Sequence, residues 1–188
     1  MRIDGIYNAD LQNGQGVGVT IGTCGCPFKC DHCFNKKAWD FNSGQEFTEE
    51  LEQKILDLLK PKYINHLSVI GGEPLIPQNI HELNSLFSKI KQTYFTKKIW
   101  VWTGYEFEDI LAIAHGRKKD SHFSWSESDK RALRNVLANI DVLIDGPFIQ
   151  EQKDLTLKWK GSANQRVIDM NRTRHDSTLH SKLEITTL

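Results

Sequence analysis

Short apolar runs that end at or near glycine alternate with amphipathic helical stripes through much of this 188-residue chain. The runs are predicted to be strands at residues 17–23, 66–70, 99–103 and 141–145. Helical periodicity is predicted between them, at residues 49–59, 80–90, 107–114 and 129–139. This alternation is typical of parallel strands joined by helical crossovers, so an α/β fold is predicted.

The length of the chain limits how far such a sheet extends. A closed eight-unit barrel of strands and helices takes about 250 residues, whereas this chain has 188. We therefore expect an open, partial (β/α) barrel, folded as a single domain over residues 1–170. A polar insertion is expected within it at about residues 115–128, and residues 171–188 are expected to form a polar C-terminal tail.

Charge and hydropathy argue against two classes of partner. Lys plus Arg and Asp plus Glu are balanced at 24 each, so no long-range field favours direct binding to nucleic acid. No apolar run approaches the roughly 20 residues of a membrane-spanning helix, and residues 1–10 lack a signal-peptide core. The sequence predicts a cytoplasmic protein with no membrane partner.

The four cysteines are clustered within residues 24–33 and none occurs elsewhere. A disulfide framework would spread its cysteines to join distant segments, so this clustering indicates a metal or redox site. Cys26, Cys30 and Cys33 have C-x3-C-x2-C spacing, which suits three thiolate ligands of a 4Fe-4S cluster and leaves one iron open to an exogenous ligand. The alternative is structural zinc with Cys24 as the fourth ligand, which the crowding of four ligands into one loop disfavours but leaves open.

A glycine-rich turn, Gly-Gly-Glu-Pro at residues 71–74, follows the second predicted strand. Alone it is a weak signal, although glycines allow a backbone to approach a ligand closely. Together with the cysteine loop it resembles the radical S-adenosylmethionine enzymes, which have C-x3-C-x-Φ-C after the first strand and a Gly-Gly-Glu-Pro type of turn after the second. His32 stands where that family usually has an aromatic residue.

The resemblance implies a 4Fe-4S cluster on Cys26, Cys30 and Cys33, with S-adenosylmethionine bound to the open iron. The residues that it assigns to S-adenosylmethionine are His32, Cys33, Phe34, Gly71, Gly72 and Glu73. It implies no catalytic side chain, because the cofactors carry the chemistry. The fold that it implies is the open partial barrel of the radical S-adenosylmethionine type.

Four further stretches resemble one group within that family, the anaerobic ribonucleoside-triphosphate reductase activating proteins. They are C-F-N-K-K-A-W at 33–39, W-T-G-Y at 102–105, D-G-P-F at 145–148 and W-K-G-S-A-N-Q-R at 159–166. Lys160 stands where the group usually has arginine. The resemblance implies an oxidoreductase that cleaves S-adenosylmethionine reductively and generates a glycyl radical on anaerobic ribonucleotide reductase, with an electron donor such as flavodoxin or ferredoxin.

Two other functions stay open. Activation of another glycyl-radical enzyme, such as pyruvate formate-lyase, would leave the resemblance at residues 159–166 unexplained. A non-catalytic zinc-binding adaptor would need Cys24 and has no use for the turn at residues 71–74. Thr103 and Asp145 lie at predicted strand ends, where each would either line the site or begin a turn.

Overall fold

A computed structural model describes residues 1–175 of the chain and contains one seven-stranded sheet in the order β3-β1-β2-β4-β5-β6-β7. The strands are β1 (Arg2–Asp10), β2 (Val17–Thr23), β3 (Gln45–Glu46), β4 (Ile64–Gly71), β5 (Lys98–Trp102), β6 (Val142–Asp145) and β7 (Arg166–Asp169). The α-helices are α1 (Glu49–Leu59), α2 (Pro77–Thr93), α3 (Phe107–Ala114), α4 (Glu127–Asn139) and α5 (Met170–His175). The strands at the two ends of the sheet, β3 and β7, do not pair with each other, so the sheet is open.

The centre of the sheet confirms the predicted α/β architecture. β2, β4, β5 and β6 are parallel neighbours, and helices connect each of them to the next. The outer strands β1, β3 and β7 pair in antiparallel fashion and were not predicted. The parallel strands therefore end at the same edge of the sheet, where the loops that follow them meet.

Element ends agree with the prediction where a local signal marks them. β2 and α3 have the predicted bounds, and Thr48 caps α1 by accepting a hydrogen bond from the backbone N–H of Leu51 (3.3 Å). α4 begins before the predicted residue 129, because Ser126 and Asp129 form a capping box. The predicted insertion at about residues 115–128 consequently ends in the first turn of α4.

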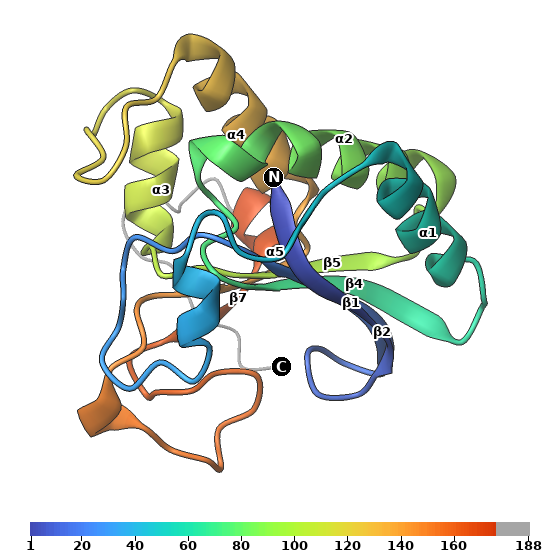
Figure 1. Ribbon diagram of the computed structural model, residues 1–188, viewed down its shortest axis with the longest axis horizontal. Helices are drawn as coiled ribbons and strands as arrows, with labels where there is room; N and C mark the ends of the chain where they lie inside the picture. Colours follow the sequence, from blue (N-terminus) through green and yellow to red (C-terminus); the bar gives the residue numbers. More distant parts are fainter. Residues whose placement is uncertain (176–188) are drawn as a thin grey trace.

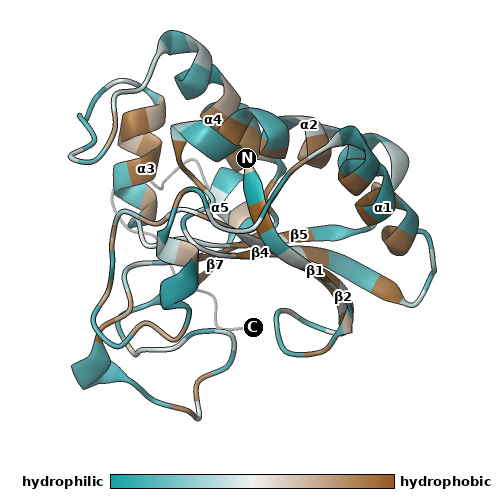
Figure 2. Ribbon diagram, viewed as in Figure 1, coloured by the Kyte–Doolittle hydropathy of each residue, from teal (hydrophilic) through white to brown (hydrophobic). Residues whose placement is uncertain are grey.

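Helices α1, α2 and α4 lie on one side of the sheet (Figure 1). Alternate residues of the parallel strands point toward these helices and are fully buried, among them Val19, Ile21, Leu67, Val69, Ile99, Val101 and Leu143. Figure 2 shows apolar stretches along these strands and helices, whereas the long loops on the opposite side of the sheet are mostly hydrophilic.

The opposite face of the sheet carries a second, smaller apolar cluster. Trp100, Val142 and Ile144 are buried there, with Trp102 and Trp159 packed against them. The indole N–H of Trp102 donates to the carbonyl of Trp159 (2.6 Å). Trp159 is therefore a packing residue, and it anchors the loop between β6 and β7 on the sheet.

The C-terminal tail predicted from residue 171 includes most of α5, and the domain boundary itself stays a prediction. Arg174 in this helix donates to the backbone carbonyls of Leu137 (3.1 Å) and Ile140 (3.0 Å), at the end of α4. The remainder of the predicted tail, residues 176–188, lies outside the described residues. None of the helices that the structure describes is both long and apolar enough to span a membrane.

The packing of α2 makes a prediction about stability. Phe87→Ala should lower the free energy of unfolding by about 3–5 kcal/mol, because it removes a fully buried ring and leaves a cavity. Phe95→Ala is the matched control, because the ring of Phe95 is 82% exposed, and its effect should stay within about 0.5 kcal/mol. Urea denaturation of the metal-free protein measures both changes, and equal effects would contradict this core.

Candidate functional site

The three predicted cluster ligands lie in the loop that follows β2. Cys26, Cys30 and Cys33 are free thiols, and each is partly exposed. Burial, followed by the negative charge of Glu73, raises the pKa of the Cys26 thiol to about 11. Burial also raises the pKa of Cys30, with the charge of Cys33 acting in the same direction. A bound metal would reverse this balance, because a coordinating thiol loses its proton.

Cys24 is set apart from these three thiols. Its side chain is 3% exposed, and burial raises its pKa. A Cβ atom on Gly44 would lie 2.7 Å from the Cys24 sulfur, so this thiol packs against the segment before β3. Among residues 1–175, no group of three or more His, Cys, Asp or Glu side chains is arranged to hold a single metal ion. Cys24 occupies a packing position.

The glycine turn after β4 packs directly on the start of the cysteine loop. The N–H of Gly72 donates to the carbonyl of Thr23 (2.6 Å), and the N–H of Glu73 donates to that of Gly25 (2.8 Å). A Cβ on Gly72 would lie 2.5 Å from the Gly25 oxygen, and one on Gly71, whose φ is +107°, would lie 2.5 Å from the Thr23 oxygen. The turn needs both glycines because two backbones meet there.

The side chain of Glu73 is turned into the protein and is 1% exposed. Its Oε1 accepts hydrogen bonds from the Thr103 hydroxyl (2.7 Å) and the Leu75 N–H (2.9 Å), and its Oε2 accepts one from the Gly104 N–H (2.7 Å). Burial raises the pKa of Glu73 to about 7, although these hydrogen bonds act to lower it. Glu73 and Thr103 therefore join the ends of β4 and β5, and contact of Glu73 with a cofactor stays a prediction.

His32 and Phe34, which the resemblance assigns to S-adenosylmethionine, lie on the exposed part of the cysteine loop. His32 has a φ of +56°, and the ring of Phe34 is 94% exposed. Phe34 lines a cavity of about 420 Å³ that lies along β1 and β2, with Tyr7, Asn13 and Thr20 on its walls. The structure brings Phe34 to a cavity beside the cysteine loop, while the cofactor contacts of both residues stay predictions.

Asp145, at the end of β6, belongs to an ion-pair network. It is 1% exposed and accepts a hydrogen bond from the N–H of Phe107 (2.8 Å), at the start of α3. Arg166 donates to Asp145 (3.0 Å) and, through both terminal nitrogens, to Glu108 (2.9 and 2.6 Å). Asp145 therefore holds the end of β6 against the start of α3.

The segment at residues 159–166 folds back on the end of β6. Gln165 accepts a hydrogen bond from the N–H of Gly161 (2.8 Å) and donates to the carbonyl of Gly146 (3.0 Å). Asn164 donates to the carbonyl of Pro147 (2.8 Å). Lys160, where the group usually has arginine, donates to the carbonyl of Gln165 (2.9 Å), so it also stabilises this loop.

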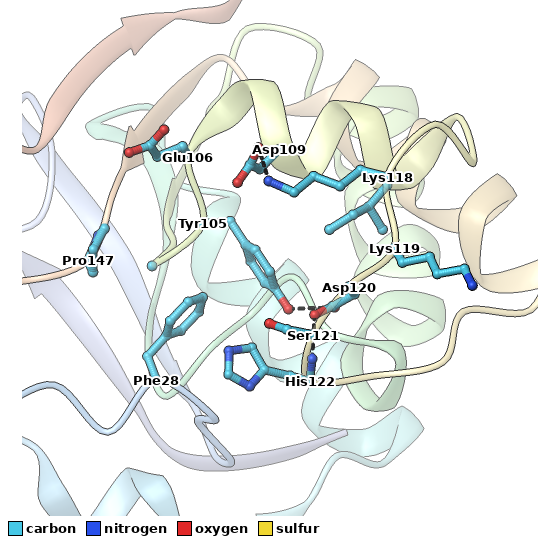
Figure 3. A pocket seen from close by; sticks show the side chains of 12 residues that line it. Phe28, Tyr105, Glu106, Asp109, Lys118, Lys119, Asp120, Ser121, His122 and Pro147 are labelled. Carbon is cyan, nitrogen blue, oxygen red and sulfur yellow. Dashed lines mark hydrogen bonds and ion pairs between the residues drawn. The ribbon is translucent and has the colours of Figure 1, made fainter.

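The insertion contributes residues that the sequence did not associate with the site. A second cavity, of about 340 Å³, lies beside Phe28 of the cysteine loop and is lined by Tyr105, Asp120 and His122 (Figure 3). Tyr105 belongs to the quoted W-T-G-Y stretch, but Asp120 and His122 lie in a polar segment without periodicity. Their position near the cysteine loop follows only from contacts between segments that are far apart in the sequence.

Comparison with known proteins agrees with this arrangement of thiols. Residues 12–168 match the family model described as "4Fe-4S single cluster domain", so the chain belongs to this class of iron-sulfur proteins. The match includes the whole cysteine loop and the glycine turn, and it ends within β7.

Curated relatives identify the family more closely. The chain is 38% identical over 169 residues to the anaerobic ribonucleoside-triphosphate reductase-activating protein of Salmonella typhimurium, an alignment that covers 89% of this chain and 97% of the relative. It is 37% identical over 163 residues to the protein of that name from Escherichia coli K12, with coverage of 86% and 94%. The corresponding protein of Enterobacteria phage T4 is 36% identical over 169 residues, with coverage of 89% and 93%. The chain belongs to the family of anaerobic ribonucleoside-triphosphate reductase-activating proteins, which confirms the resemblance found in its sequence.

The placement of the cysteines makes a prediction about iron binding. Replacing Cys26, Cys30 or Cys33 by alanine should abolish the brown 4Fe-4S chromophore after anaerobic reconstitution with iron and sulfide, because each removes one of three ligands. Cys24→Ala is the matched control and should keep most of the chromophore. Iron content and absorbance spectra measure the outcome. Equal loss in all four variants, with zinc recovered in place of iron, would contradict the assignment.

The contact between the glycine turn and the cysteine loop makes a second prediction. Gly72→Ala should lower the free energy of unfolding of the metal-free protein by about 1–3 kcal/mol, since the new Cβ would lie 2.5 Å from a backbone oxygen. In the control, Gly5→Ala, the Cβ would meet only the flexible side chain of Tyr7, at 3.3 Å. Its effect should be smaller, and an equal effect in urea denaturation would count against the close contact.

Proposed function

We propose that this protein uses a 4Fe-4S cluster and S-adenosylmethionine to generate a glycyl radical on anaerobic ribonucleotide reductase. The observation that carries the proposal is the similarity, over 89% of the chain, to a relative named as an activator of that reductase. The cysteine loop supports it, because the donor set is three accessible free thiols in one loop. Three soft sulfur ligands suit an iron-sulfur cluster with one open iron.

The residues of the chain would hold and orient the cofactors. When bound and supplied with one electron, the cluster and S-adenosylmethionine would provide a 5′-deoxyadenosyl radical, with methionine as the leaving group, and this radical would take a hydrogen atom from a glycine of the partner. Cys26, Cys30 and Cys33 would hold the cluster. His32, Phe34 and the turn at residues 71–73 would hold S-adenosylmethionine, and the hydrogen bonds from Gly72 and Glu73 keep that turn against the cysteine loop.

The proposed fold is an open partial barrel of the radical S-adenosylmethionine type. It is supported by the unpaired ends of the sheet and by helices that cover one face. An open barrel suits a protein substrate, because a peptide loop must enter from the side while the reacting atoms stay shielded from water. A reduced flavodoxin or ferredoxin is the proposed electron donor, and the cytoplasm is the proposed location.

The proposal predicts which partner acquires a radical. The reduced protein with S-adenosylmethionine should produce a glycyl signal on an anaerobic ribonucleotide reductase and none on pyruvate formate-lyase. The cofactor chemistry is common to both reactions, so the discrimination should come from docking of the partner loop. Electron paramagnetic resonance after anaerobic mixing measures the signal on each partner, with Cys30→Ala as the control. A signal on the lyase alone would overturn the assigned partner and leave the cluster chemistry standing.

A further inference from the structure

Asp120, in the insertion between α3 and α4, accepts hydrogen bonds from within the insertion and from the loop after β5. Its Oδ2 accepts from the Tyr105 hydroxyl and from the indole N–H of Trp125, both at 2.8 Å. Its Oδ1 accepts from the backbone N–H of His122 (2.8 Å). Figure 3 shows the side chain of Tyr105 pointing at Asp120 beneath α3. One carboxylate therefore shapes the insertion and anchors it to the loop after β5.

The residues that Asp120 holds contact the cysteine loop. The ring of Phe28, which lies between Cys26 and Cys30 in the chain, packs edge-on against Tyr105, with centroids 4.9 Å apart. Phe28 also contacts the imidazole of His122 at 5.4 Å. On its other side Phe28 covers Gly104, where a Cβ would lie 2.6 Å from the ring. Two of the groups that pack against Phe28, the rings of Tyr105 and His122, therefore belong to residues that are hydrogen-bonded to Asp120.

A second contact connects the insertion to the beginning of the cysteine loop. Phe123, three residues after Asp120, packs against Phe41 with ring centroids 6.2 Å apart. Phe41 in turn fills the space beside Gly25, where a Cβ would lie 2.4 Å from its ring. Gly25 directly precedes Cys26. The insertion therefore contacts Phe28 directly and reaches Gly25 through Phe41.

We propose that Asp120 is a positioning residue that holds the insertion over the Phe28 side of the cysteine loop, and that the insertion screens Cys26 and Cys30 from solvent there. The inference deepens the proposed function, because a screened cluster loses iron more slowly and has a potential set by a drier surrounding. Asp120 acts through Tyr105 and Phe28 and touches none of the three thiols itself.

The first test uses metal-free protein in which Cys26 is the only cysteine. Asp120→Ala should raise the rate of Cys26 alkylation by N-ethylmaleimide at least five-fold. Asp109→Ala is the matched control, because Asp109 lines the same cavity and also pairs with a residue of the insertion, Lys118 (2.5 Å), but both side chains are more than 40% exposed, so this pair contributes little. Its rate should match that of the parent. Equal rates for the parent and Asp120→Ala would overturn the proposal.

A charge-neutral variant separates screening from electrostatics. Asp120→Asn keeps one acceptor oxygen, so its alkylation rate should lie between those of the parent and Asp120→Ala. Equal rates for the two variants would mean that the charge alone acts, and the screening proposal would fall. If Asp120→Ala does not fold, Tyr105→Phe removes only the hydroxyl that binds Asp120 and should raise the rate about two-fold or more.

The second test uses the reconstituted protein. In Asp120→Ala the chromophore should bleach several-fold faster in air, and the midpoint potential of the cluster should rise, because water stabilises the more negative reduced state and a negative side chain is lost. Asp109→Ala should change neither. An unchanged potential and bleaching rate in Asp120→Ala would count against the proposal. Failure of the unsubstituted protein to assemble any cluster would instead refute the proposed function, and the alkylation rates would still decide the role of Asp120.

Discussion

The buried carboxylate of Glu73 is the interaction on which the geometry of the site depends. It accepts hydrogen bonds from its own turn and from Thr103 and Gly104 at the end of β5, while its backbone N–H reaches Gly25 at the start of the cysteine loop. Burying a carboxylate in this interior without such donors would raise the free energy of the folded state by several kcal/mol. The carboxylate joins the ends of β4 and β5, and the backbone N–H of the same residue joins them to the residues that follow β2, so Glu73 connects all three strand ends at the start of the cysteine loop.

The same physical device recurs at the end of β6. Asp145 is as buried as Glu73, and it accepts the backbone N–H of Phe107 at the start of α3. The first N–H groups of a helix have no partner within the helix, so an acceptor from another segment both satisfies them and orients the helix. Arg166 brings Glu108 into this network. The loops at this edge of the sheet have no regular secondary structure, and the buried carboxylates of Glu73 and Asp145 stabilise them by accepting backbone hydrogen bonds.

Local signals in the sequence predicted much of the fold. β2 and α3 have the predicted bounds, because β-branched alternation and a helical stripe marked them without help from other segments. β1 and β7 were missed since they pair in antiparallel fashion and are less apolar than the central strands, and β3 has only two residues. In the site, spacing revealed Cys26, Cys30 and Cys33, but the bond between Glu73 and Thr103 joins residues 30 positions apart, which no periodicity reports.

The cysteine loop is packed against other segments near Phe28 but borders a cavity near Phe34. On one side Phe28 packs against Tyr105 and against His122 of the insertion. On the other, the exposed ring of Phe34 borders a cavity along β1 and β2. A reaction that makes a radical needs water kept from the cofactors and yet must admit a protein loop. Under the proposed function, the insertion excludes water on the Phe28 side of the loop, and the partner loop enters on the Phe34 side. Because the two requirements are met on different sides, closer packing of the insertion need not block entry of the partner.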